Sequence, residues 1–160
     1  MAAKLKIRRY TDSDNKDVWK LHILGLEQFT AYLGGKWDKD LHDIENVYLK
    51  NGDFIVGEID GKIIVMGAFK KISDKSAEIK RIRVHPDYQR RGFGQTILDE
   101  LEKRAAKKGY KILQLDTTNK QIPAQKFFEK NGYVKTKTER LEKYGLDMIF
   151  YEKRIKRLKC

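Results

Sequence analysis

The chain has 160 residues, of which 40% are hydrophobic and 36% charged, and its formal net charge is +12. This length is enough for one domain with a substantial core, and the composition excludes an intrinsically disordered chain. No apolar run reaches the roughly 20 residues of a membrane-spanning helix. Cys160 is the only cysteine, which excludes an internal disulfide or a cysteine-based zinc site. The first residues lack the apolar core of a signal peptide, so we expect one domain over residues 1–160 in the cytoplasm.

The positive charge is spread along the chain in lysine and arginine pairs that alternate with acidic residues. Such a pattern is typical of a solvated surface, although it also favours encounters with anions. The densest basic run covers residues 153–159. Nucleic-acid binding is disfavoured, because the chain lacks a helix-turn-helix, a zinc pattern and the aromatic ribonucleoprotein motifs.

Helical patterns dominate the first third of the chain. Residues 4–9 predict a short opening strand, and the polar residues 11–14 offer N-caps for a helix whose apolar face begins at Val18. Helical periodicity resumes over residues 26–33, and a weaker helical stretch covers residues 39–49.

The pattern changes to strands at residue 53. "DFIVGEIDGKIIVMGAFK" contains two apolar runs joined by Asp60-Gly61, which predicts a two-residue hairpin turn. The second run is apolar at both parities, as expected for a strand that is covered on both faces.

In the next predicted strand, "SAEIKRIRV", the apolar residues change from one set of alternate positions to the other. Ile79 occupies one parity, whereas Ile82 and Val84 occupy the other. Two interpretations remain open: a β-bulge near Lys80-Arg81 that re-aims the side chains, or a strand with mixed faces.

A glycine loop and further α/β elements complete the chain. "HPD" ends the strand, "QRRGFG" follows, and residues 95–108 form an amphipathic helix. Next come a strand over 110–118, a helix over 122–132 and two closing strands, "YVKT" and "LDMIFYEKRI". This order predicts a mixed α/β sheet, not a doubly wound one.

The glycine loop has the features of an anion site. Gly92 and Gly94 leave the backbone N–H groups open at a helix N-terminus, and Arg90 and Arg91 add positive charge. The Walker A pattern is absent, the dinucleotide fingerprint would need a glycine where Ile97 stands, and no kinase motif follows the loop. The common nucleotide sites are therefore excluded.

Two motifs resemble those of the GNAT superfamily of acetyl-CoA-dependent N-acetyltransferases. "QRRGFG" matches the signature Gln/Arg-x-x-Gly-x-Gly/Ala, within "IRVHPDYQRRGFGQTILDELEKRAAKKG", and "AQKFFEKNGY" resembles the second core motif. The resemblance is specific over residues 79–133. It implies a mixed, mainly antiparallel sheet of about seven strands, flanked by helices and splayed between the fourth and fifth strands.

The resemblance also implies an activity and its partners. Acetyl-CoA would donate an acetyl group to a primary amine of a small molecule or peptide, by direct transfer in a ternary complex. The alternative is a protein of the same fold that binds acetyl-CoA without turnover. Neither a metal nor a membrane is implied, and a homodimer is left open.

The site residues implied by the resemblance fall on the fourth strand and the glycine loop. Glu78 is the candidate general base, although a surface glutamate paired with a lysine is the alternative. His85 is expected to belong to the turn. The residues that would bind the coenzyme are Ile82, Arg83, Val84, Gln89, Arg90, Arg91, Gly92, Phe93, Gly94, Gln95, Thr96, Gln121 and Phe128.

The chain departs from the family pattern in two places. Phe128 stands where a tyrosine usually protonates the leaving thiolate, and Gln121 stands where an asparagine usually contacts the pantetheine. Tyr133 and Tyr144 are further candidates for the acid. The acceptor pocket would lie near residues 26–40, with Tyr32 and Trp37, and near residues 138–146. The positive charge mildly favours an acceptor with a carboxylate or phosphate.

Overall fold

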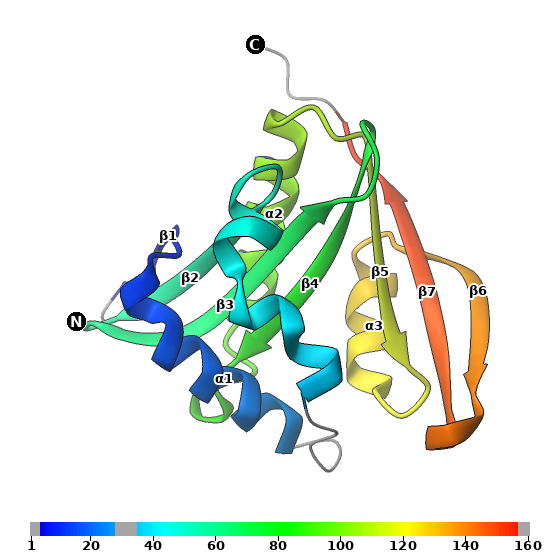
Figure 1. Cartoon of the computed structure of the whole chain (residues 1–160), viewed down its shortest axis with the longest axis horizontal. Helices are drawn as coiled ribbons and strands as arrows, with labels where there is room; N and C mark the ends of the chain where they lie inside the picture. Colours follow the sequence, from blue (N-terminus) through cyan, green and yellow to red (C-terminus); the bar gives the residue numbers. More distant parts are fainter. Residues whose placement is uncertain (1–3, 28–34, 157–160) are drawn as a thin grey trace.

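A computed structural model describes residues 4–27 and 35–156 of the chain, and its centre is a seven-stranded sheet (Figure 1). The strand order is β1-β2-β3-β4-β5-β7-β6. All neighbouring strands are antiparallel except β4 and β5, which are parallel. The strands are β1 (Lys6–Arg9), β2 (Asp53–Ile59), β3 (Lys62–Lys71), β4 (Ser76–Val84), β5 (Ile112–Thr118), β6 (Val134–Leu141) and β7 (Leu146–Arg154). The mixed, mainly antiparallel sheet predicted from the sequence is confirmed.

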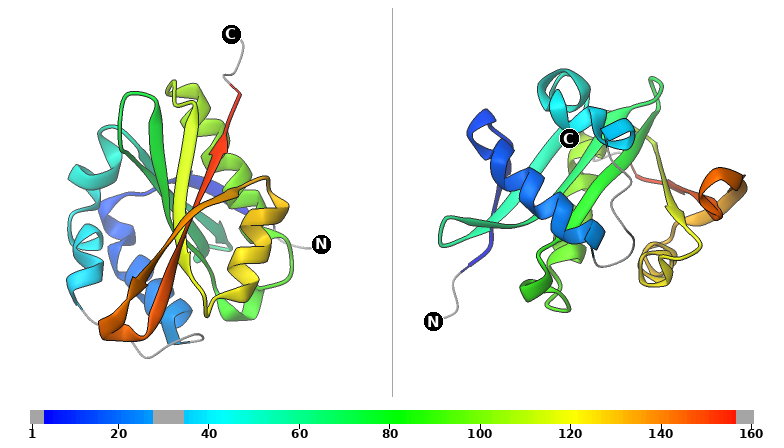
Figure 2. Two further views of the ribbon diagram at one scale, coloured as in Figure 1. Left: turned by 90° about the vertical axis from the view of Figure 1, so that its right-hand side faces the viewer. Right: turned by 60° about the horizontal axis from the view of Figure 1, so that its bottom comes forward.

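Helices cover both faces of the sheet (Figure 2). On one face lies α1 (Asn15–Glu27), together with a 3-10 helix, η2 (Gly35–His42), and a π-helical turn, η3 (Glu45–Leu49). On the other face lie α2 (Phe93–Lys107) and α3 (Ile122–Lys130). No helix among the described residues is long and apolar enough to cross a bilayer.

The first third of the chain differs in part from the prediction. The helix that starts after residues 11–14 is α1, and the weaker helical stretch predicted over residues 39–49 consists of the end of η2 and of η3, not of one regular α-helix. These helical turns bring Leu41, Ile44 and Tyr48 together in one buried cluster against β2 and β3. Most of the helical pattern at 26–33 lies outside the described residues, as does Tyr32.

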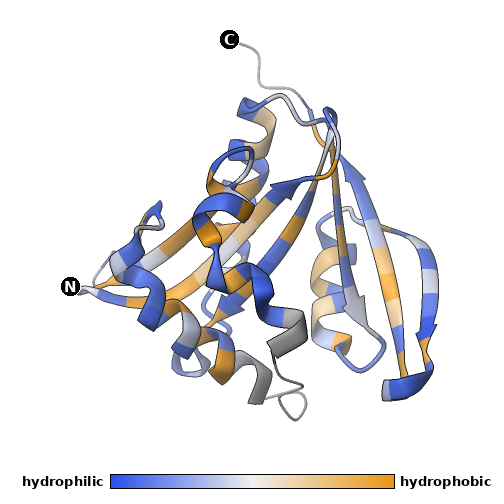
Figure 3. Cartoon of the chain, viewed as in Figure 1, coloured by the Kyte–Doolittle hydropathy of each residue, from blue (hydrophilic) through white to orange (hydrophobic). Residues whose placement is uncertain are grey.

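The central strand β3 is buried on both faces, as its double apolar parity predicts. Ile63 to Phe69 are buried, with one face packed on α2 and the other on the cluster around Tyr48. Apolar residues concentrate on these central strands, whereas the edge strand β6 is mostly hydrophilic and exposed (Figure 3). The hairpin turn at Asp60-Gly61 is present, with φ of 52° and 79°.

The parity slip in β4 is a β-bulge. Met66 pairs with Arg83 and Ala68 with Lys80, so β4 has one more residue than β3 across this interval. Arg81 adopts a left-handed φ of 63°, which is uncommon for a residue with a side chain. Ile79 lies before the bulge and belongs to the apolar cluster that packs against α2. Because of the extra residue, Ile82 and Val84 after the bulge pack against the same cluster. Of the two interpretations left open by the sequence, the bulge is correct.

The sheet is splayed between β4 and β5. Their parallel pairing covers only Ser76 to Glu78 with Ile112 to Gln114, after which the strands diverge. Beyond Glu78, the backbone of β4 therefore has no partner strand on its β5 side. The predicted splay is confirmed, and it creates the cleft in which the candidate site lies.

Candidate active site

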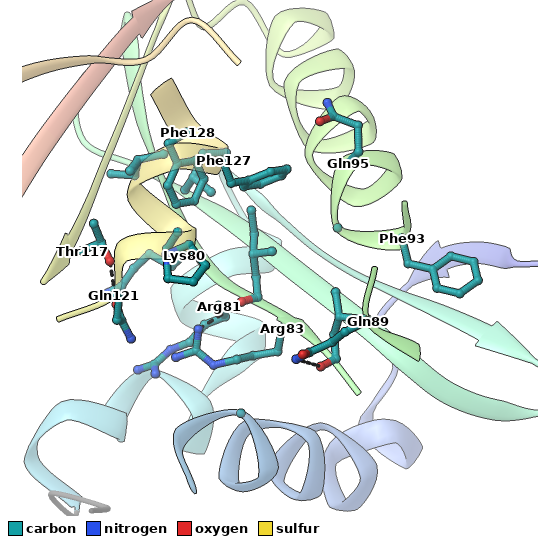
Figure 4. A pocket seen from close by; sticks show the side chains of 18 of the residues that line it. Lys80, Arg81, Arg83, Gln89, Phe93, Gln95, Thr117, Gln121, Phe127 and Phe128 are labelled. Carbon is teal, nitrogen blue, oxygen red and sulfur yellow. Dashed lines mark hydrogen bonds between the residues drawn. The ribbon is translucent and has the colours of Figure 1, made fainter. Parts of the chain in front are cut away.

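A cavity of about 720 Å³ fills the splay between β4 and β5. Its walls come from β4, the loop before α2, the first residues of α2, the end of β5, and α3. Phe127 and Phe128 form an apolar wall on the α3 side, and polar side chains from β4 lie opposite them (Figure 4). An elongated ligand with one polar and one apolar side would fit this lining.

The glycine loop opens this cavity at the N-terminus of α2. Arg90 and Gly92 adopt left-handed φ values of 62° and 84°, and this geometry turns the chain from β4 into the helix. The first helical acceptor is Gly92 O, which receives the N–H of Thr96 at 3.1 Å. The N–H groups of residues 93–95 precede that bond and belong to the unsatisfied helix start. These donors and the helix dipole favour an anion at this end of the cavity.

Neighbouring side chains hold the loop in place. His85 Nδ1 accepts the N–H of Asp87 (3.1 Å), so His85 belongs to the turn, as expected. Gln89 Nε2 donates to Val84 O at 3.3 Å. Arg91 lies over the ring of Tyr88, with 5.3 Å between the guanidinium carbon and the ring centroid.

Most of the predicted coenzyme-binding residues meet around the cavity. Arg91 and Thr96 are the exceptions: Arg91 stacks on Tyr88, and the Thr96 hydroxyl donates to Gly92 O (3.0 Å). The others line the cavity, and they are Ile82, Arg83, Val84, Gln89, Arg90, Gly92, Phe93, Gly94, Gln95, Gln121 and Phe128. Gln121 is held there by the hydroxyl of Thr117, which donates to its Oε1 at 2.6 Å.

Glu78 lies in the cavity with a second carboxylate that the sequence did not single out. Asp116 projects from β5, and partial desolvation in the cleft followed by the nearby Glu78 carboxylate raises the pKa of Asp116. Glu78 also approaches Lys70, with 3.7 Å between Nζ and Oε1. The lysine pairing weighed as the alternative therefore exists, yet Glu78 also faces the cavity.

The tyrosines proposed as acids do not line this cavity. The Tyr133 hydroxyl donates to Glu102 (3.1 Å), and burial followed by that carboxylate raises the pKa of Tyr133. Tyr144 belongs to the short turn between β6 and β7. Phe128 is buried against Tyr133, with 5.7 Å between the ring centroids. Among the described residues, no tyrosine hydroxyl occupies the position of the usual acid.

Beside the bulge, a buried ion-pair network closes the α1 side of the cavity. Arg81 bonds Asp40 through Nε (2.8 Å) and Nη2 (2.5 Å), and Asp38 through Nη1 (3.3 Å). Asp38 also accepts from His22 Nε2 at 2.9 Å, and the Tyr48 hydroxyl donates to Asp40. Burial and the positive charge of Arg81 lower the pKa of His22, which leaves it neutral. The network fixes η2 against the bulged part of β4.

Replacing Arg81 by methionine is expected to destabilise the fold by about 3–5 kcal/mol, because two buried carboxylates would lose their cation. The matched control is Arg140→Met, which removes an exposed pair with Asp147 and is expected to cost at most about 1 kcal/mol. Urea unfolding of both variants measures the difference. Equal losses would show that the Arg81 network contributes no more than a surface pair.

The architecture and the cavity define an acyltransferase fold with a coenzyme-sized cleft, and comparison with known proteins gives the family. The sequence profile described as "Acetyltransferase (GNAT) family" matches residues 10–133. The chain therefore belongs to the GNAT family of acetyltransferases. The assignment made from the two motifs is confirmed, and with it the class of cosubstrate, acetyl-CoA.

Two curated relatives share part of this chain. The "Probable N-acetyltransferase camello" of Xenopus tropicalis is 32% identical over 74% of this chain and 63% of its own length. The "Amino-acid acetyltransferase" of Azotobacter vinelandii is 32% identical over 66% of this chain. The chain spans only 24% of the length of that second relative.

Solved structures agree on the fold. A GNAT-family acetyltransferase from Staphylococcus aureus superposes with a TM-score of 0.85 at 21% identity, over 96% of this chain and all of that one. A GNAT-family acetyltransferase from Elizabethkingia anophelis, solved with acetyl-CoA bound, has a TM-score of 0.70 at 21% identity, over 94% and 98% of the two chains.

Proposed function

We propose that this protein is an N-acetyltransferase that moves the acetyl group of acetyl-CoA to a primary amine of a small molecule or peptide, by direct transfer in a ternary complex. The observation that carries the proposal is that three features needed for acetyl transfer line one and the same cavity. The open N-terminus of α2, the unpaired edge of β4 and a pair of carboxylates line the same cavity. An anion site, a strand edge and a proton acceptor are what acyl transfer from a pantetheine thioester to an amine needs.

Each part of the cavity has a proposed task. Backbone N–H groups at the start of α2, with Arg90, would hold the pyrophosphate of the coenzyme. The free edge of β4 at residues 82–84 would pair with the amides of the pantetheine arm, as an added strand does. Gln121 would offer a further amide contact, and Phe128 an apolar wall.

The carboxylates Glu78 and Asp116 would accept the proton of the acceptor ammonium, directly or through water. Loss of that proton frees the nitrogen lone pair, which forms a bond to the acetyl carbon while the carbon–sulfur bond breaks and its electron pair leaves on sulfur as a thiolate. The nitrogen then gives up a second proton, which passes to the thiolate directly or through water. The coenzyme supplies an activated acetyl group, and a thiol with a pKa of about 8.5 is a good leaving group. Phe128 in place of an acidic tyrosine is therefore compatible with turnover.

The second candidate is a protein that binds acetyl-CoA without turnover. The observation in its favour is the absence of a tyrosine hydroxyl at the position of Phe128 among the described residues. A cytoplasmic location stays a prediction, and the oligomeric state was left open by the sequence.

Calorimetry and an acceptor panel together test these functions. Acetyl-CoA is expected to bind with a one-to-one stoichiometry, and free thiol is expected to appear when amines and amino acids are supplied. Binding without thiol release above the acetyl-CoA hydrolysis background, over the whole panel, would favour the binding-only protein. Absence of binding by the folded chain would contradict both candidates.

A further inference from the structure

Arg83 lies on β4 directly after the bulge, and its side chain extends over the face that α1 covers. Gly25 of α1 leaves the space for it: a β-carbon at position 25 would lie 2.5 Å from Arg83 Cδ and 3.1 Å from its Nε. Arg81 and Arg83 lie next to one another on the side of the cleft that faces α1 (Figure 4). The glycine and the bulge together direct this guanidinium into the cleft.

The Arg83 guanidinium has no acidic partner among the described residues. Its Nη1 donates to Ile82 O (3.0 Å), but its Nε is buried and bonds to nothing in the described part of the chain. Asp38, whose charge acts on Arg83, accepts from His22 and Arg81 through Oδ1, and its Oδ2 has no partner among the described residues. Asp40 bonds Arg81 and Tyr48. Buried polar groups are nearly always hydrogen-bonded, so a cavity-lining guanidinium that has no carboxylate bonded to it and a buried Nε without an acceptor points to a ligand.

The electrostatics of Arg83 fit the same conclusion. Burial, with repulsion from Arg81, lowers the pKa of Arg83 to about 10. The group thus stays charged at neutral pH, although that charge is unfavourable without a counterion. Arginine presents a planar fork of donors that matches a carboxylate in two-point contact.

The same cavity also holds Glu78 and Asp116, whose negative charge suits an ammonium group. An acceptor that carries both an amine and a carboxylate would match both charged regions. The coenzyme phosphates have their own donors, Arg90 and the start of α2.

We propose that Arg83 binds a carboxylate of the acceptor, so that the acceptor is an amino acid or another small amine that carries a carboxylate. This inference rests on the proposed transferase function and narrows it to one substrate class.

Matched acceptors test the inference. The probes are the common amino acids, each beside its own carboxamide, with kcat/KM measured by thiol release at saturating acetyl-CoA. Wild type is expected to prefer the acid over the amide by about tenfold or more, since a charge-assisted hydrogen bond contributes that much. Arg83→Gln is expected to remove this preference by lowering kcat/KM for the acids about 10- to 100-fold more than for the amides. Because the preference is compared between variants, the different basicities of acids and amides cancel.

Two further variants separate binding from structure. Arg154→Gln removes an exposed guanidinium near the closed end of the sheet, and it is expected to leave the preference unchanged. Gly25→Ala keeps every charge but displaces Arg83, and it is expected to weaken the preference even if Arg83→Gln folds poorly. Alanine also has the higher helix propensity, so α1 itself is not weakened by this change.

Each other result overturns the inference. Turnover of amides or plain amines as fast as of acids, or an Arg83→Gln variant with the wild-type preference, would contradict the carboxylate contact and leave the transferase function intact. An Arg83→Gln variant whose only change is weaker acetyl-CoA binding in calorimetry would assign Arg83 to the coenzyme. No turnover with any acceptor would remove the transferase function and the inference together.

Discussion

Replacement of Gly94 by glutamate is expected to abolish acetyl-CoA binding while the fold survives. A β-carbon at position 94 would meet only Val84 Cγ2, at 3.6 Å, which is an ordinary contact. A carboxylate in the first turn of α2 is also favourable for the helix. The same carboxylate would occupy the open helix start and repel the pyrophosphate proposed to bind there, weakening affinity at least about 100-fold.

Gly94→Ala is the matched control, because it adds the β-carbon without the charge. Calorimetry with acetyl-CoA is expected to give nearly wild-type affinity for Gly94→Ala and no measurable binding for Gly94→Glu. Thermal unfolding of both variants checks that the fold is intact. Wild-type affinity in the folded glutamate variant would contradict the placement of the pyrophosphate at this helix start.

The sequence revealed the strand elements of this fold because their signals are local. The Asp60-Gly61 turn, the double apolar parity of β3 and the parity slip at Lys80-Arg81 each depend on residues close together in the chain. The bulge was one of two open interpretations, because Arg81 at a left-handed φ is stabilised by Asp38 and Asp40, which come from a distant segment. The helical stretch around Ile44 was predicted, but its irregular 3-10 and π-helical geometry was not, since tertiary packing decides it.

The open helix start after the glycine loop was likewise predictable, and so was the place of Glu78 on β4, whereas the second carboxylate of the cavity was not. Asp116 carries no local signal, because "LDTT" reads as an ordinary strand end. Asp116 becomes part of the candidate site only because the short parallel pairing of β4 with β5 brings it close to Glu78. The position of the Arg83 side chain depends in turn on Gly25, which lies in α1. Contacts between segments far apart in the chain produce no periodic pattern in the sequence, so they could not be predicted from it.

The pair Glu78 and Asp116 makes a prediction about the pH dependence of turnover. A base must be unprotonated to accept a proton, so the rate rises with pH through the pKa of that base. Desolvation in the cleft, followed by the Glu78 charge, raises the pKa of Asp116, and the wild-type rise is therefore expected at a higher pH than for an isolated carboxyl group. Glu78→Gln removes that charge and is expected to shift the rise to lower pH. Profiles of kcat at a fixed, saturating acceptor measure the shift.

Loss of both carboxylates is expected to have the largest catalytic effect in the molecule. The double variant Glu78→Gln, Asp116→Asn should lower kcat by about 100- to 10,000-fold at neutral pH, the usual contribution of a general base. Acetyl-CoA affinity should persist, because the proposed phosphate contacts lie at the start of α2. The control is Asp74→Asn, an exposed carboxylate in the turn between β3 and β4.

The two single variants then show how the proton is shared. If the two carboxylates share the role of base, each single variant should keep part of the activity and change the acidic limb of the profile of kcat against pH. If Asp116→Asn left the limb unchanged while Glu78→Gln removed it, Glu78 alone would be the base. If both single variants and the double variant kept the wild-type profile, proton transfer would occur elsewhere, and the carboxylates would then only attract the ammonium group of the acceptor.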